Sequence, residues 1–168
     1  MLRVMGAVLI VLSGSLAGFY YSGRLKKRCD ILQEFSAFLA ELKTRIRYSG
    51  ADIFSLLSSL DGSKHINAVI DFVNQNKDSG KSLPDLWEQA VTIAFKGSPL
   101  KESDRKAMIQ FGETLGTADV CGELAHIDLY VEIFDKLLKS AGRELNEKSK
   151  LYKTLGFFAG TSIALMIV

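Results

Sequence analysis

An uncharged apolar run near the N-terminus constrains this chain more than any other feature. It covers residues 4–21, and the cations Arg24, Lys26, Lys27 and Arg28 follow it directly. Eighteen residues of helix rise about 27 Å, which is enough for the hydrocarbon core of a bilayer. Because cations beside a span stay on the cytoplasmic side, the sequence predicts a transmembrane helix within residues 1–23 and an N-terminus outside.

A second uncharged run, residues 155–168, ends the chain and follows Lys148, Lys150 and Lys153. Its fourteen residues rise about 21 Å, so it either spans a locally thinned bilayer or stops short of the far face. Its cations lie on the same side as those of the first run. We therefore expect a C-terminal transmembrane segment at 154–168, a cytoplasmic domain at 24–153 and both termini outside.

A cleaved signal peptide is the alternative interpretation of the N-terminal run. Ser15, Leu16 and Ala17, which precede Gly18, resemble the small-x-small pattern of a cleavage site. The basic cluster opposes export of the chain beyond it, and the run continues past that site to Tyr21. In this alternative the body would be an exported helical protein.

The charges separate the body from the two ends. Residues 29–147 contain 13 Lys and Arg and all 19 Asp and Glu, so this region carries a net charge of −6 although the chain as a whole is at +2. Cations concentrated beside the spans suit anionic lipid headgroups. An acidic body excludes nucleic acid as the expected partner. Cys29 and Cys121 lack metal-type spacing and are expected to stay reduced in a cytoplasmic body.

The central region predicts an all-α bundle of about six helices. Apolar residues recur at steps of three and four between 25 and 48 and again between 120 and 145, and no useful stretch alternates at strand period. About 130 residues are enough for a single core. The first stripe comprises Ile31, Leu32, Phe35, Phe38, Leu39, Leu42 and Ile46.

Two shorter helices each follow a glycine, at Gly50 and at Gly80. Ser82 and Asp85 have the spacing of a capping box, and Trp87 is expected to anchor the core. A further helix is expected from about Ser103 through Leu115. Gly116 then suits a left-handed helix end, and Thr117 or Asp119 can cap the next helix.

The sequence offers little that points to catalysis. Neither glycine-containing loop has the spacing of a phosphate loop, and His65 and His126 lack paired metal ligands. We therefore predict no catalytic, metal or cofactor residues, and the protein is expected not to be an enzyme. Asp128, Glu132 and Asp135 follow helical spacing; they form either a solvated face or a docking surface for a basic partner.

Both apolar runs contain paired glycines. Gly14 and Gly18 lie four residues apart, as do Gly156 and Gly160, so each pair shares one helix face and permits close backbone approach. Two arrangements remain open: packing of the two spans against each other, or packing against a sister subunit in a homo-oligomer.

Several of these motifs, in this order, resemble the stage III sporulation protein AB family over nearly the whole chain. They are residues 6–11 and 14–19, the pairs Phe111-Gly112 and Leu115-Gly116 with Asp119, and the ending Leu151, Tyr152, Lys153, Thr154, Leu155, Gly156 and Gly160. The two glycine-led segments are also similar to the cytoplasmic domain of type II secretion F platform proteins. After Asp119, Val120-Cys121-Gly122-Glu123 replaces a polar stretch with a glutamine that is usual in the family, which puts a shared binding role there in doubt.

The resemblance implies a non-enzymatic platform in the mother-cell membrane facing the forespore, within a secretion-like channel complex. Its expected partners are other stage III sporulation channel subunits and a secretion-type ATPase similar to stage III sporulation protein AA. A membrane-tethered adaptor for another cytoplasmic partner is the second interpretation of the sequence, and the exported helical protein is the third.

Overall fold

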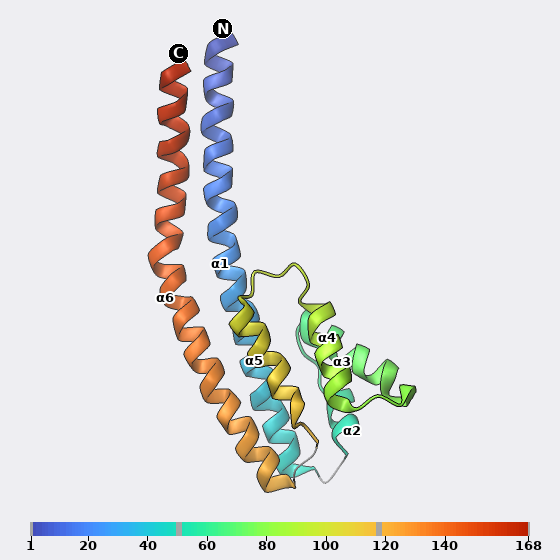
Figure 1. Ribbon diagram of the computed structural model, residues 1–168. Coiled ribbons are helices and arrows are strands. Elements are labelled where there is room, and N and C mark those ends of the chain that lie inside the picture. The colour runs from blue at the N-terminus through green and yellow to red at the C-terminus, as the bar shows by residue number, and fades with distance from the viewer. Residues whose placement is uncertain (1, 50–51, 117–118, 168) are drawn as a thin grey trace. The chain divides into compact units, whose positions relative to one another are not determined.

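The computed structural model describes residues 2–49, 52–116 and 119–167; the side chains of 2–8, 10, 153, 157, 159–160 and 163–167 are outside this description. The described residues form helices and no strand, which confirms the predicted all-α fold of about six helices (Figure 1). The helices are α1 (Leu2–Tyr48), α2 (Ile53–Ser58), α3 (Lys64–Asn76), the short 3-10 helix η1 (Lys77–Ser79), α4 (Leu83–Ala94), α5 (Glu102–Glu113) and α6 (Val120–Ile167).

The chain divides into two compact units. The first, which we call the helix pair, consists of residues 1–29 and 139–168; the second, the body, consists of residues 30–138. Within the helix pair, the N-terminal part of α1 and the C-terminal part of α6 lie side by side (Figure 1). The body contains the remaining parts of these helices together with α2 to α5.

The described part of the chain contains no helix that is both long enough and apolar enough to cross a membrane. The two membrane spans predicted from the sequence are therefore not confirmed. Several side chains of both apolar runs, including those of residues 4–8 and 163–167, lie outside the described residues.

The core of the body is built on the predicted stripe of α1. All seven residues of that stripe are buried. Phe35 stacks on Phe134 of α6 with ring centroids 4.5 Å apart and meets Phe111 of α5 edge-on at 6.0 Å. Trp87 is fully buried, and its Nε1 donates a hydrogen bond to the Met108 carbonyl at 2.8 Å. This satisfied indole confirms Trp87 as a core anchor.

The helix ends follow the capping chemistry of the sequence. The Ser82 hydroxyl accepts a hydrogen bond from the Asp85 amide at 3.3 Å, and Asp119 accepts one from the Gly122 amide at 2.8 Å. Gly80 and Gly116 are left-handed, with φ of 75° and 78°. The predicted roles of Gly50 and Thr117 lie outside the described residues. One boundary differs, because α5 ends at Glu113 before Leu115, which nevertheless stays buried beyond the helix.

Candidate functional site

The paired glycines of the helix pair meet each other. A Cβ added at Gly156 of α6 would overlap the Gly14 carbonyl oxygen of α1 and would lie 3.2 Å from both the Cα and the amide nitrogen of Gly18. The two backbones therefore approach so closely that no side chain fits between them. Of the two arrangements left open by the sequence, this geometry is the packing of the two ends against each other. The contacts of Gly160 are outside what the structure describes.

Polar and aromatic contacts continue this interface toward residue 29. The hydroxyls of Ser22 and Ser149 are 2.6 Å apart, and the Ser22 side chain is buried. The rings of Tyr21 and Tyr152 have centroids 5.9 Å apart. Tyr152 belongs to the ending by which the sequence resembles its family, so this motif contributes directly to the helix pair.

A buried ion pair lies at the end of the same interface. Arg28 of α1 is 3% exposed, and its guanidinium donates to the Glu144 carboxylate of α6 at 2.9 Å. Lys148 also donates to Glu144, at 2.7 Å, and this hydrogen bond, together with the carboxylate charge, raises the pKa of the Lys148 ammonium. Two cations thus share one carboxylate, and both hydrogen bonds are charge-assisted; Arg28 is the more deeply buried of the two cations.

The predicted juxtamembrane cations consequently separate into different environments. Arg28 lies inside the helix pair, whereas Arg24, Lys26, Lys27 and Lys150 are exposed. Only the exposed cations are available to anionic headgroups. The Lys153 side chain lies outside the described residues.

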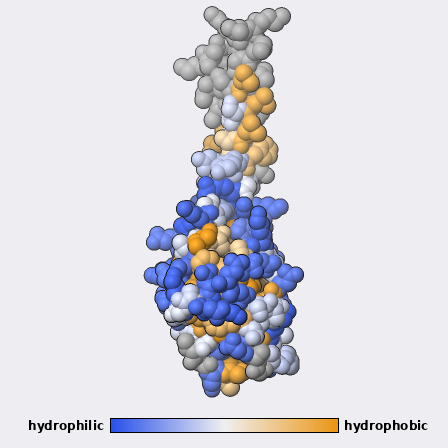
Figure 2. All heavy atoms as spheres, turned by 90° about the vertical axis from the view of Figure 1, so that its right-hand side faces the viewer, coloured by the Kyte–Doolittle hydropathy of each residue, from blue (hydrophilic) through white to orange (hydrophobic). Residues whose placement is uncertain are grey.

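Large apolar side chains of the helix pair are exposed along both helices. Figure 2 shows orange residues gathered on the described atoms of this unit, whereas the body is covered largely by polar residues. Such contiguous exposed apolar surface marks an interaction surface in a folded chain. The exposed side chains comprise Leu9, Leu12, Leu16, Phe19, Tyr20, Tyr21, Leu151, Leu155 and Phe158.

The three predicted docking carboxylates lie on α6 in the body, and all three are exposed. Asp128 forms a salt bridge with Lys43 of α1, so its charge is partly compensated within the body. Glu132 and Asp135 continue the same helix at steps of four and three residues, so the three share one side of it.

The family-motif residues between α5 and α6 build a tight corner. Leu115 is buried, and the Gly116 amide donates a hydrogen bond to the Glu123 carboxylate at 2.6 Å. Glu123 is itself 5% exposed. The stretch 120–123, which departs from the family pattern, therefore supplies a buried carboxylate that stabilises the corner. Asp119 adds the cap at the start of α6. We assign the corner a role in folding.

Both histidines pack against aromatic rings. His65 stacks on Phe95 at 5.5 Å, and His126 stacks on Phe111 at the same centroid distance. An imidazole nitrogen of His126 also lies 2.9 Å from the Phe111 carbonyl oxygen. Among the described residues, no group of three His, Cys, Asp or Glu side chains is placed to hold a metal ion.

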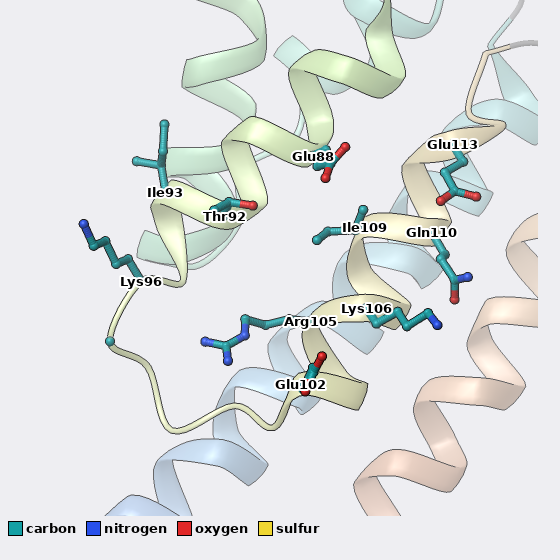
Figure 3. A pocket seen from close by; sticks show the side chains of 11 residues that line it. Glu88, Thr92, Ile93, Lys96, Glu102, Arg105, Lys106, Ile109, Gln110 and Glu113 are labelled. Carbon is teal, nitrogen blue, oxygen red and sulfur yellow. The ribbon is translucent and has the colours of Figure 1, made fainter.

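A surface groove between α4 and α5 did not emerge from the sequence. Figure 3 shows Thr92 and Glu88 of α4 facing Ile109 of α5 across it, with Arg105 and Lys106 farther along. Ile93, also of α4, lines it and is 59% exposed. Helical periodicity assigns residues to a face of a helix, but it does not reveal which two helices bring those faces together.

Comparison with known proteins agrees with this architecture. The family model of stage III sporulation protein AB matches residues 3–168. The chain belongs to the stage III sporulation protein AB family. Stage III sporulation protein AB of Bacillus subtilis (strain 168) is 27% identical over 174 residues, which cover 100% of both chains.

A solved structure of a stage III sporulation protein AB shares the fold. Its TM-score is 0.60 at 22% identity, and the match covers 71% of this chain and 96% of the solved one. The family resemblance inferred from the sequence motifs is thus confirmed. The Bacillus subtilis relative also matches both apolar ends, because the alignment runs over its full length.

Proposed function

We propose that the protein is a non-enzymatic platform subunit in the mother-cell membrane, anchored by both apolar ends and docking a secretion-type ATPase within a secretion-like channel complex. Membership of the stage III sporulation protein AB family supports the role in sporulation. The helix pair serves as the anchor and the acidic body as the docking module.

The exposed apolar surface of the helix pair carries the anchoring part of the proposal. Leu9, Leu12 and Leu16 are 63%, 53% and 68% exposed, and Phe158 of α6 is 60% exposed. Leaving such large side chains in water is unfavourable by about 1.5–3 kcal/mol each relative to burial. Acyl chains would cover them, while the glycine contact and the Ser22–Ser149 pair remain between the helices.

The acidic face of α6 supports the docking part. Asp128, Glu132 and Asp135 are all exposed on a body with a net charge of −6, and Asp128 also forms a salt bridge with Lys43. A face of this kind attracts a basic surface and accelerates its encounter. We propose that Glu132 and Asp135 contact cationic side chains of the ATPase, which would supply the energy for the complex.

A binding measurement with charge reversal tests the docking proposal. Full-length protein in detergent is immobilised and titrated with a secretion-type ATPase similar to stage III sporulation protein AA. The double variant Glu132→Lys and Asp135→Lys should bind at least about tenfold more weakly. A matched control carries the same change of charge at Asp71 and Asp78, which are exposed on α3 and η1. Equal loss in both double variants, or no loss in either, would contradict docking on this face.

A further inference from the structure

The groove between α4 and α5 has opposite charges at its two ends. Glu88 and Glu113 lie at one end, whereas toward the other end the cations Lys96, Arg105 and Lys106 outnumber the single carboxylate of Glu102, so the two ends differ in net charge (Figure 3). Glu88, Lys96 and Arg105 form no ion pair with any other described residue. Between the charged ends the lining includes Thr92, which contributes neither a charge nor a large side chain.

The exposed side of α4 is self-complementary in charge, because rotating a second copy of the helix by 180° brings its basic end against the acidic end of the first. Glu88, Thr92 and Lys96 recur at steps of four, so they form one ridge along the helix and the turn after it. Glu88 and Lys96 are equally distant from Thr92 in sequence and opposite in charge. A two-fold axis passing close to Thr92 would place each Glu88 against Lys96 of a second copy, with Thr92 meeting its own counterpart at the centre.

We propose that this groove is the interface of a homodimer in which α4 of each copy packs antiparallel to α4 of the other. A two-fold contact uses the same patch on both subunits, so a self-complementary patch is its requirement. The ridge of one α4 then occupies the α4–α5 groove of the other copy. The contact shields Ile93, which is 59% exposed in the single chain, and half-buried Ile109 from water.

Charge complementarity favours a second copy over an unrelated occupant. A uniformly basic or uniformly acidic partner segment would be repelled at one end of the groove, because the net charge of that end has the same sign as the segment. A second copy satisfies both ends at once. The groove is separate from the acidic side of α6, so the dimer forms whether or not an ATPase docks there.

Charge reversal in the full-length protein tests the pairing. In detergent at low salt, Glu88→Lys should weaken dimerisation at least about tenfold, since two attractive pairs become two repulsive ones. Lys96→Glu should do the same. The double variant Glu88→Lys with Lys96→Glu restores opposite charges across the axis, so it should dimerise within about threefold of the unaltered protein. Asp71→Lys is the control, because it makes the same change of charge at an exposed residue of α3, and it should leave the dimer unchanged.

Cross-linking at the axis provides a readout that does not depend on affinity. A single cysteine at Thr92, in a chain whose Cys29 and Cys121 are replaced by serine, should form a disulfide-linked dimer on mild oxidation in membranes, because only positions close to a two-fold axis meet their own copy. The same cysteine at Asp71 should remain monomeric. A monomeric mass for the unaltered protein, failure of the double variant to recover, or equal cross-linking at both positions would overturn the proposal.

Discussion

Arg28 and Glu144 form a buried pair that joins α1 to α6 across 116 residues of sequence. Their side chains are only 4% and 15% exposed. Removing Glu144 takes from the buried Arg28 guanidinium the carboxylate that it binds, and breaking a buried pair in this way costs about 3–5 kcal/mol, whereas an apolar replacement of both is often close to neutral. Removing Arg28 costs less, because Lys148 still donates to the Glu144 carboxylate. We therefore expect Glu144→Met to lower stability strongly, Arg28→Met to lower it less, and the double variant to recover most of the loss caused by Glu144→Met.

Thermal unfolding of the full chain in detergent measures this cycle. Lys26→Met, a change at an exposed cation two residues away, is the matched control and should shift the midpoint little. A double variant as unstable as the two single losses added together would show that Arg28 and Glu144 contribute independently, which contradicts their pairing.

Gly112 is the second residue whose replacement has a specific expected cost. A Cβ at this position would overlap the indole ring of Trp87, which is buried and held by its hydrogen bond to Met108. Gly112→Ala should therefore destabilise the protein by about 1–3 kcal/mol through overpacking. Gly142→Ala on α6 meets nothing within 4 Å and should instead be neutral or stabilising by up to about 1 kcal/mol. Chemical denaturation checks both, and an equal effect of the two substitutions would contradict the contact with Trp87.

At the scale of elements, sequence patterns predicted what is local. The apolar stripe, the Ser82 cap and the left-handed Gly116 each depend on residues within a few positions of one another, and all appear in the structure. The partner of Arg28 and the pairing of α4 with α5 depend on residues far apart in sequence. Periodicity assigns a residue to a face of a helix, but it does not say which helix covers that face.

The close approach of α1 and α6 at Gly14, Gly18 and Gly156 can be tested by cross-linking the two helices. Ser22 and Ser149 have hydroxyls 2.6 Å apart, so cysteines at both positions should form a disulfide readily. Gly156→Leu would force the backbones apart at Gly14 and Gly18, and we expect disulfide formation to fall at least about fivefold. Oxidation of isolated membranes followed by gel electrophoresis measures the fraction cross-linked, in a chain without Cys29 and Cys121.

Gly23→Leu is the matched control, because a Cβ at this exposed glycine of α1 meets nothing within 4 Å. Cross-linking should be unchanged there. If Gly156→Leu also leaves it unchanged, the close approach does not hold the helices together, and the paired glycines would be free to serve contacts with another subunit.

At the scale of the whole molecule, charge and apolarity divide along the chain. The body contains most of the acidic residues, and the helix pair carries the long apolar exposed surface. Sequence composition predicted this division. It could not predict that one of the four cations after the first apolar run would be buried, because Glu144, which pairs with Arg28, lies 116 residues away in the sequence.

The topology of the full chain gives the last prediction. If both ends are anchored with the body inside, the intact protein keeps its full mass of 18.5 kDa, and an impermeant maleimide leaves Cys121 unlabelled in whole cells. After lysis Cys121, which is exposed at the start of α6, should react rapidly, while half-buried Cys29 should react more slowly until the protein is denatured. A cysteine introduced at Leu2 should be labelled from outside. A mass that begins at Gly18, or labelling of Cys121 in whole cells, would instead place the acidic body outside, because a cleaved N-terminal run no longer holds it at the cytoplasmic face.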